Sequence, residues 1–122
     1  MRASSDAVLV VDDDVDILET IQMVLEGSGY TVLTAQNGLA ALELLRAGER
    51  VRVILLDMMM PTMDGWQFRE AQQHDPAIAG IPVVIMTGDS HVTDKAAKVG
   101  ATAYLRKPTS VAPLLSTIAR FF

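Results

Sequence analysis

The 122-residue sequence has no cysteine, and no apolar stretch in it approaches the roughly 20 residues of a membrane-spanning helix. The missing cysteines exclude a disulfide framework and a metal site built on thiolates. Residues 1–14, MRASSDAVLVVDDD, reach a block of acids after a short apolar run, so we do not expect them to be a secretory signal peptide. Basic residues are outnumbered, 10 against 15 acidic, and the net charge of −5 disfavours direct nucleic-acid binding. We therefore expect a cytoplasmic protein without a nucleic-acid or membrane partner.

The overall composition of the chain is that of an ordinary globular domain. Half of the residues are hydrophobic and a fifth are charged, so the chain has enough apolar surface to bury. A chain of this length supports one domain with one sizeable core. With no internal repeat, low-complexity segment or linker in the sequence, we predict a single domain over residues 1–122, with an ordered core over about 7–122.

Short β-branched runs alternate with stretches of helical periodicity along the chain. The predicted strands are residues 8–11, 31–35, 51–56, 81–86 and 103–106. The predicted helices are residues 15–26, 39–47, about 65–73, 92–99 and 111–122. Asp14 or Asp16 is expected to cap the first helix, and the GSG at 27–29 to end it. Pro113 falls in the first turn of the last helix, where proline is tolerated.

Five successive strand–helix pairs predict an α/β fold, a (βα)5 doubly wound parallel sheet with helices on both faces. The first, third and fourth strands are almost entirely aliphatic, as is typical of central strands covered on both sides. The second strand, TVLTA, carries threonines, and the short fifth strand, AYLR, ends in an arginine. Both suit the edges of the sheet. The strand order 2-1-3-4-5, which flavodoxin-like folds share, satisfies these constraints.

In this order the chain reverses direction between the first and third strands, and folds of this class bind ligands at the carboxyl ends of those strands. The first strand is followed by Asp12, Asp13 and Asp14, and the third strand by Asp57. We therefore expect Asp57 to lie in a crevice that faces other carboxylates.

Several carboxylates in one crevice repel each other unless a cation balances them. An all-oxygen site with few protein ligands suits Mg²⁺. Lys107, at the end of the fifth strand, offers a second positive charge. Thr87, at the end of the fourth strand, places a hydroxyl on the same rim, and Gly88 leaves the entrance open. The charge of about −3 from Asp12, Asp13 and Asp57 is then balanced by about +3 from Mg²⁺ and Lys107.

Each of these residues alone has a purely structural interpretation. The acids before the first helix are also typical N-caps, and an aspartate after a strand is often a turn former. Lys107 alone is typical of a surface, and Thr87 alone of a strand end. In combination, the ends of four strands place an acid pair, a further acid, a hydroxyl and an ammonium at one edge of the sheet. This combination favours a functional site.

Four segments of the sequence resemble the receiver domain of two-component response regulators, of the chemotaxis-regulator type, and the resemblance covers almost the whole chain. They are VLVVDDDVDI at 8–17, VILLDMMMPTMDG at 53–65, VVIMTGD at 83–89 and GATAYLRKP at 100–108. The resemblance implies that Asp57 accepts a phosphoryl group, and that Asp12, Asp13, Asp57 and the backbone carbonyl of Met59 bind Mg²⁺. It further implies that Lys107 pairs with the phosphoryl group, that Thr87 donates a hydrogen bond to it, that Tyr104 is an aromatic switch, and that the bond between Lys107 and Pro108 is cis.

The same resemblance implies the partners. A histidine kinase or histidine phosphotransfer protein is expected to supply the phosphoryl group, and a downstream protein or output domain to read the surface formed by residues 92–99, 103–106 and 111–122. The chain is expected to catalyse its own phosphorylation and dephosphorylation without being an enzyme in the turnover sense. Receivers that dimerise through this surface usually carry acids near the fifth strand. The segment GATAY has none, so we expect a monomer before phosphorylation.

Other functions on the same fold fit less well. A phosphatase with an aspartate nucleophile generally needs an acid two residues later, where this chain has Met59, which cannot transfer a proton. A flavin-binding protein would need a Ser/Thr/Gly-rich phosphate loop after the first strand. The alternative that stays open is an interaction module that works without phosphorylation.

Overall fold

The computed structural model describes residues 6–88, 100–107 and 110–122, and five strands in this part of the chain form one parallel sheet. The strands are β1 (Ala7–Val11), β2 (Thr31–Ala35), β3 (Val51–Asp57), β4 (Val83–Thr87) and β5 (Ala103–Arg106). Their order is β2-β1-β3-β4-β5, so the predicted order and the doubly wound α/β class are confirmed.

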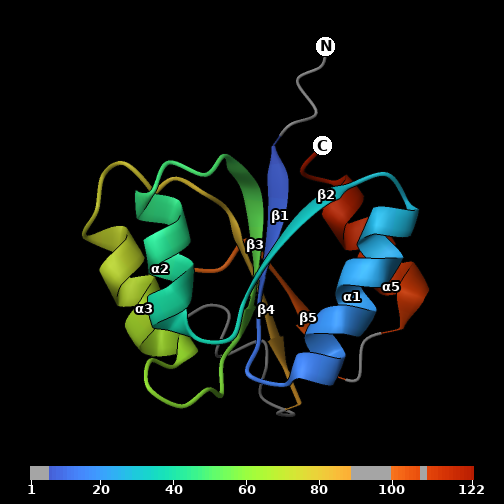
Figure 1. Cartoon of the computed structure of the whole chain (residues 1–122), viewed down its shortest axis with the longest axis horizontal. Coiled ribbons are helices and arrows are strands. Elements are labelled where there is room, and N and C mark those ends of the chain that lie inside the picture. Colours follow the sequence, from blue (N-terminus) through green and yellow to red (C-terminus); the bar gives the residue numbers. More distant parts are fainter. Residues whose placement is uncertain (1–5, 89–99, 108–109) are drawn as a thin grey trace.

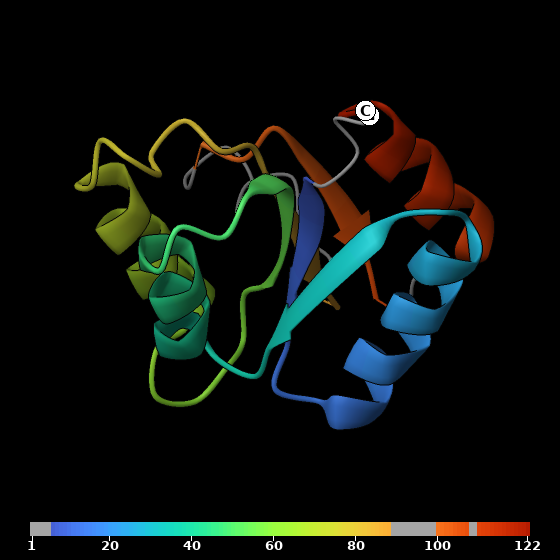
Figure 2. The ribbon, with the colours of Figure 1, turned by 45° about the horizontal axis from the view of Figure 1, so that its top comes forward.

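Helices cover both faces of this sheet (Figure 1). They are α1 (Val15–Gly27), α2 (Gly38–Arg46), α3 (Gly65–Gln73) and α5 (Val111–Ala119). Helices α2 and α3 lie on one side, and α1 and α5 on the other, in both views (Figures 1 and 2). The helix predicted at 92–99 lies outside the described residues. None of the described helices is long and apolar enough to cross a membrane.

The core consists of two apolar layers, because side chains along a strand alternate between the two faces of the sheet. In β1, Leu9 and Val11 pack in the layer beneath α2 and α3, whereas Val8 and Val10 pack in the layer beneath α1 and α5. Strands β1, β3 and β4 are buried along almost their whole length. This double burial explains why their sequences are runs of aliphatic residues.

Several predicted boundaries differ from the structure by one to three residues. Strand β4 begins at Val83 rather than at residue 81, since Pro82 has no amide hydrogen to donate to the sheet. The last helix ends at Ala119 rather than at residue 122. Residues after the helix contact β3: Arg52 donates a hydrogen bond to the Phe121 carbonyl, and the Arg52 guanidinium lies 5.3 Å from the centre of the Phe122 ring.

Local capping fixes where α1 and α3 begin, and both starts lie beside the carboxyl edge of the sheet. The Asp14 side chain accepts hydrogen bonds from the backbone N–H groups of Asp16 and Ile17, so Asp14 is the cap of α1. Asp64 and Gln67 form a reciprocal capping box at the start of α3. The caps set the direction in which each helix leaves its strand.

We expect Gly65→Ala to lower the free energy of unfolding by about 1–3 kcal/mol, because the added methyl group has no space. A Cβ at this position would lie 2.5 Å from Met58 Sδ, 2.8 Å from Met58 Cα and 3.1 Å from the Asp57 carbonyl oxygen. Urea denaturation measures the change. Gly80→Ala is the matched control, since a Cβ there meets nothing within 4 Å. Equal stability of the two variants would contradict this close packing.

Candidate functional site

The carboxyl edge of the sheet brings together residues that are far apart in the sequence. Val11 of β1 pairs with Leu56 of β3, so Asp12 and Asp57, the next residue on each strand, lie level with each other. Lys107 directly follows β5, and its backbone N–H donates to the Thr87 carbonyl at the end of β4, at 3.0 Å. The site is thus positioned by the ends of strands β1, β3, β4 and β5.

Three carboxylates form a cluster at this edge. One oxygen from each of Asp12, Asp13 and Asp57 lies within 4.8 Å of the others. Asp12 is fully buried and Asp57 is 3% exposed, whereas Asp13 is exposed to solvent. The predicted gathering of these acids is therefore confirmed by the geometry. The burial of two of them makes their mutual repulsion costly, since the surroundings screen it poorly.

Backbone N–H groups stabilise one oxygen of each buried acid. Asp12 Oδ1 accepts from the N–H of Asp14 at 2.9 Å, and Asp57 Oδ1 accepts from the N–H of Met59 at 3.3 Å. The Met59 side chain, 67% exposed, extends into solvent beside the site. Both interactions span two residues, so they depend on the turn that the chain makes directly after each acid.

Lys107 supplies the positive charge to both buried acids. Its Nζ lies 2.7 Å from Asp12 Oδ2 and 3.3 Å from Asp57 Oδ2. The lysine side chain is itself only 21% exposed. The sequence predicted that Lys107 would lie among these acids, but it did not predict that its shortest contact would be to Asp12.

Burial and charge shift the proton affinities of this pair of groups. Burial, together with the negative charge of Asp12, raises the pKa of Asp57 from 3.8 to about 6, and Lys107 and the Met59 N–H only partly offset this rise. Burial alone would lower the pKa of Lys107, but its contacts with Asp12 and Asp57 outweigh burial and raise that pKa. A buried carboxylate that has a raised pKa and is flanked by an ammonium is typical of functional sites.

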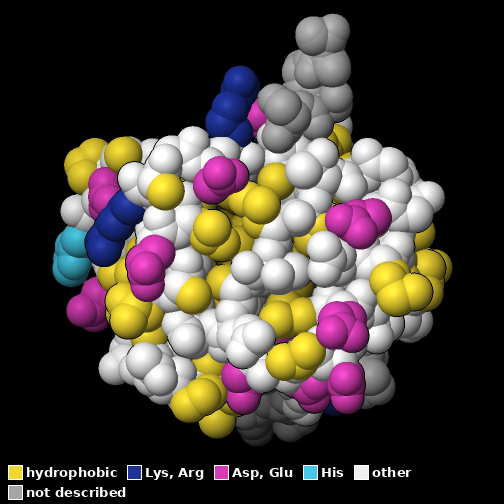
Figure 3. Space-filling view, in the orientation of Figure 1, with side chains coloured by type: hydrophobic (Ala, Val, Ile, Leu, Met, Phe, Trp, Pro, Cys, Tyr) yellow, Lys and Arg dark blue, Asp and Glu magenta, His cyan; other side chains and the backbone are white. Residues whose placement is uncertain are grey.

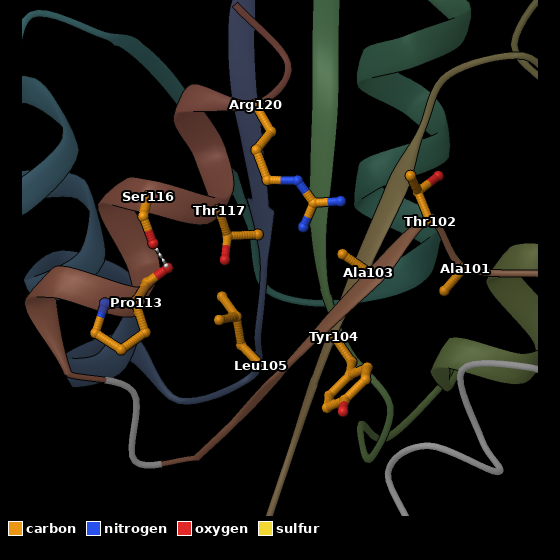
Figure 4. Close-up of a pocket in the computed structure, with 9 residues that line it drawn as sticks. All are labelled: Ala101, Thr102, Ala103, Tyr104, Leu105, Pro113, Ser116, Thr117 and Arg120. Carbon is orange, nitrogen blue, oxygen red and sulfur yellow. Dashed lines mark hydrogen bonds between the residues drawn. The ribbon is translucent and has the colours of Figure 1, made fainter.

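The two predicted switch residues lie on the neighbouring strands β4 and β5. Thr87 is 1% exposed at the end of β4, and Asp57 of β3 pairs with Met86, the residue directly before it. Tyr104 is 46% exposed on β5. Figure 4 shows its ring directed away from α5, whereas Leu105 points toward α5. Tyr104 borders an open groove of about 610 Å³ that Thr117 of α5 and Arg120, the residue directly after α5, also line. Pro108, and with it the predicted cis bond, lies outside the described residues.

The surface around the site is acidic. Figure 3 shows acidic side chains along the lower edge of the molecule in this view, near the start of α1. Asp13, Asp14 and Asp16 are among the exposed acids of this segment. The negative potential of such an edge attracts cations.

Two features of the site were missed from the sequence. The contact of the Met59 N–H with the Asp57 side chain has a backbone donor, which leaves no mark on the residue type at position 59. The tight approach of Gly65 to Met58 does leave a mark, because the Asp64-Gly65 pair combines a helix cap with the one residue that has no Cβ. That pair could have indicated close packing of Gly65 against Asp57 and Met58.

The fold and this edge define a doubly wound α/β protein with a carboxylate and lysine site at its topological switch point. The family model of the response regulator receiver domain matches residues 8–119. The chain therefore belongs to the response regulator receiver domain family of two-component signalling.

Relatives with curated names support this membership. The chain is 36% identical over 113 residues to protein PilH of Pseudomonas aeruginosa, an alignment that covers 91% of this chain and 93% of PilH. It is 41% identical over 116 residues to the transcriptional regulatory protein ZraR of Klebsiella oxytoca, which covers 92% of this chain but 25% of ZraR. It spans 47% of the response regulator MprA of Mycobacterium ulcerans. The chain thus spans half or less of several relatives.

A solved structure agrees with the fold. The chemotaxis protein CheY4 of Vibrio cholerae matches with a TM-score of 0.86 at 32% identity, over 96% of this chain and 98% of CheY4. The match covers nearly the whole of both chains, as it does for PilH.

The raised pKa of Asp57 predicts a pH-dependent effect of its removal. The folded protein binds this proton more tightly than the unfolded chain, so the resulting stabilisation is fully present below pH 3.8 and is lost as the pH rises through about 6. At pH 8 without divalent cations, Asp57→Asn should therefore raise the free energy of unfolding by about 1–3 kcal/mol. The gain should shrink below pH 6 and vanish near pH 4, as measured by urea titration in a chelating buffer.

The control is Glu43→Gln, which removes one exposed carboxylate from α2. It should leave the free energy of unfolding almost unchanged at every pH. An Asp57→Asn variant that is less stable than the native chain at pH 8 would show that Lys107 outweighs burial and repulsion at this site.

Proposed function

We propose that the chain is a phosphorylation-activated switch that accepts a phosphoryl group on Asp57 from a phosphohistidine. The observation that carries this proposal is the arrangement of a buried Asp57 carboxylate with Lys107 Nζ at 3.3 Å and two further acids within 4.8 Å. A nucleophilic carboxylate oxygen, a fixed ammonium and a cation-binding acid pair are the groups that phosphoryl transfer requires.

In the proposed transfer, an oxygen of Asp57 attacks the phosphorus and the phosphorus–nitrogen bond of the phosphohistidine breaks. The electron pair of that bond stays with the imidazole of the donor, which then takes up a proton. Lys107 and the Thr87 hydroxyl stabilise the negative charge on the phosphoryl oxygens. The product is an acyl phosphate, whose hydrolysis returns Asp57 to its free form. The chain thus catalyses its own modification and reset, and it is not an enzyme with turnover.

The residues present fit a Mg²⁺ ion as the cofactor. Asp12, Asp13 and Asp57 offer only oxygen donors, and Lys107 neutralises only one of their three negative charges. We propose that these acids and the Met59 carbonyl hold the ion. When bound, it neutralises charge on the transferring phosphoryl group.

The donor is proposed to be a histidine kinase or a histidine phosphotransfer protein, met in the cytoplasm. The partner that recognises the phosphorylated form is proposed to be a downstream protein or an output domain that contacts the β5 and α5 surface around Tyr104. The unphosphorylated chain is proposed to be a monomer.

Incubation with acetyl phosphate and Mg²⁺, followed by intact-mass analysis, tests the proposal. We expect the mass of one phosphoryl group to be added to the native chain, and no addition to Asp57→Asn, which lacks the nucleophilic oxygen. Omission of Mg²⁺ should suppress the reaction. A native chain whose mass stays unchanged would instead favour an interaction module that works without phosphorylation.

Thr87→Ala tests the link between the site and the output surface. The nucleophile and the acid cluster remain in this variant, so the acyl phosphate should still form. Because the hydroxyl that would bond the phosphoryl group is gone, we expect Tyr104 to respond less. The NMR signals of the Tyr104 ring should shift on phosphorylation in the native chain, and at least several-fold less in Thr87→Ala.

Thr34→Ala, on the exposed face of edge strand β2, is the matched control and should behave like the native chain. Phosphorylation of each variant is verified by mass in the same samples. A full Tyr104 response in phosphorylated Thr87→Ala would exclude this route while leaving phosphorylation of Asp57 intact.

A further inference from the structure

A network of side chains joins helix α3 to the chain segments that lead into strands β4 and β5. Gln72 of α3 is fully buried, and its Nε2 donates hydrogen bonds to the carbonyls of Ile78 at 2.9 Å and Ile81 at 3.0 Å. Its Oε1 accepts a hydrogen bond from Nη1 of Arg69 at 2.8 Å. A buried amide that uses both donors and its acceptor fixes the groups around it. None of these residues belongs to the acid cluster.

The guanidinium of Arg69 extends this network to the turn from which β5 begins. Its Nη2 donates to the Gly100 carbonyl at 3.4 Å, while Nη1 donates to Gln72. Gly100 has a φ of 67°, and a Cβ at this position would lie 3.6 Å from Arg69 Nη2. Directly after this turn, the Thr102 N–H donates to the Val83 carbonyl at 2.8 Å. One planar guanidinium serves both acceptors because its N–H groups form a fixed fork.

The two ends of the network differ in strength. The hydrogen bonds from Gln72 to the carbonyls of Ile78 and Ile81 are short, and Gln72 is excluded from solvent. The bond from Arg69 to Gly100 is longer than a typical N–H···O bond, and Gly100 is exposed. Because water can replace the donor at an exposed carbonyl, breaking this bond costs little. The approach to β4 is thus held firmly, and the contact of Arg69 with the approach to β5 is weak.

We propose that Arg69 is a releasable latch, which holds the start of β5 against α3 in the unphosphorylated chain and lets go when β5 changes its arrangement. The inference rests on the switch function proposed above and assigns a positioning residue outside the acid cluster. Tyr104 follows Gly100 closely on the same strand, so a change at this turn reaches Tyr104 along β5. A bond that is made in only one of two arrangements biases the equilibrium toward that arrangement.

Loss of the latch should loosen the start of β5 and leave the approach to β4 intact. In Arg69→Met we expect the Thr102 amide to exchange with deuterium about three-fold faster or more. The Ile81 amide donates to the Ile78 carbonyl within the segment that Gln72 holds, so its rate should stay within about two-fold of the native rate. NMR-detected hydrogen exchange of the unphosphorylated chain measures both amides. A general loss of stability would accelerate both alike.

The NMR signals of the Tyr104 ring give a readout that a purely structural role would not move. In unphosphorylated Arg69→Met, these signals should be displaced from their native positions toward those of the phosphorylated native chain. We expect the equilibrium between the two arrangements to shift about three- to ten-fold, the change that loss of one hydrogen bond commonly produces. Acetyl phosphate should still phosphorylate Asp57 in this variant, since the acid cluster is unchanged.

Arg46→Met is the matched control. It removes the same type of side chain from an exposed pair with Asp75, at 3.5 Å, in the segment that leads to β4. The exchange rate of the Thr102 amide and the positions of the Tyr104 signals should both stay native. An effect confined to Arg69→Met therefore reports the contact with Gly100 rather than the loss of one positive charge.

Arg69→Lys covers the case in which Arg69→Met does not fold. The ammonium keeps the charge and can donate to Gln72 Oε1, but it lacks the fork that reaches both acceptors. We expect its melting temperature to lie closer to that of the native chain than the melting temperature of Arg69→Met. The Thr102 amide should nevertheless exchange faster, and the Tyr104 signals should be displaced in the same direction.

The outcomes separate the latch from the proposed function. Native exchange of Thr102 in the folded Arg69 variants, or equal acceleration of Thr102 and Ile81, overturns the latch and leaves phosphorylation of Asp57 standing. The same holds if the Tyr104 signals keep their native positions in these variants while they respond to phosphorylation in the native chain. A native chain that is not phosphorylated, or whose Tyr104 signals do not respond to verified phosphorylation, overturns the proposed switch and the latch together.

Discussion

The burial of two like charges side by side is the constraint on which the rest of this structure depends. Asp12 and Asp57 lie at the ends of adjacent buried strands, and burial together with the charge of Asp12 raises the pKa of Asp57. Lys107, reaching from the end of β5, contacts both. The site therefore holds an excess of negative charge that an ammonium only partly balances, and this excess supports the proposed cation site.

The parallel sheet is what makes such an arrangement possible. In the order β2-β1-β3-β4-β5, strands distant in the sequence become neighbours, and all of their carboxyl ends meet at one edge. The two apolar layers on either side hold the strands in register, so that residues directly beyond the core become a fixed rim. The helix caps at Asp14 and Asp64 then fix where α1 and α3 begin beside this rim.

Much of this could be predicted from the sequence, because the signals involved are local. Aliphatic runs of strand length, apolar positions at helical spacing and acids directly after strands lie within short windows of the chain. They predicted the strand order and the gathering of Asp12, Asp13 and Asp57, which are confirmed. The last helix was predicted too long because apolar residues continue to Phe122, whereas after Ala119 the backbone N–H groups donate to the carbonyl three residues back.

The sequence by itself determined which residue types follow each strand, and hence that acids, a hydroxyl and a lysine would share one edge. The periodicity of strands and helices determined this, since burial of apolar side chains leaves few ways to assemble them. Only the tertiary structure decided that Lys107 lies closer to Asp12 than to Asp57, and that backbone N–H groups occupy the remaining oxygens. The difference between contacts of 2.7 Å and 3.3 Å arises from the packing of whole strands and turns, and no local pattern of residues encodes it.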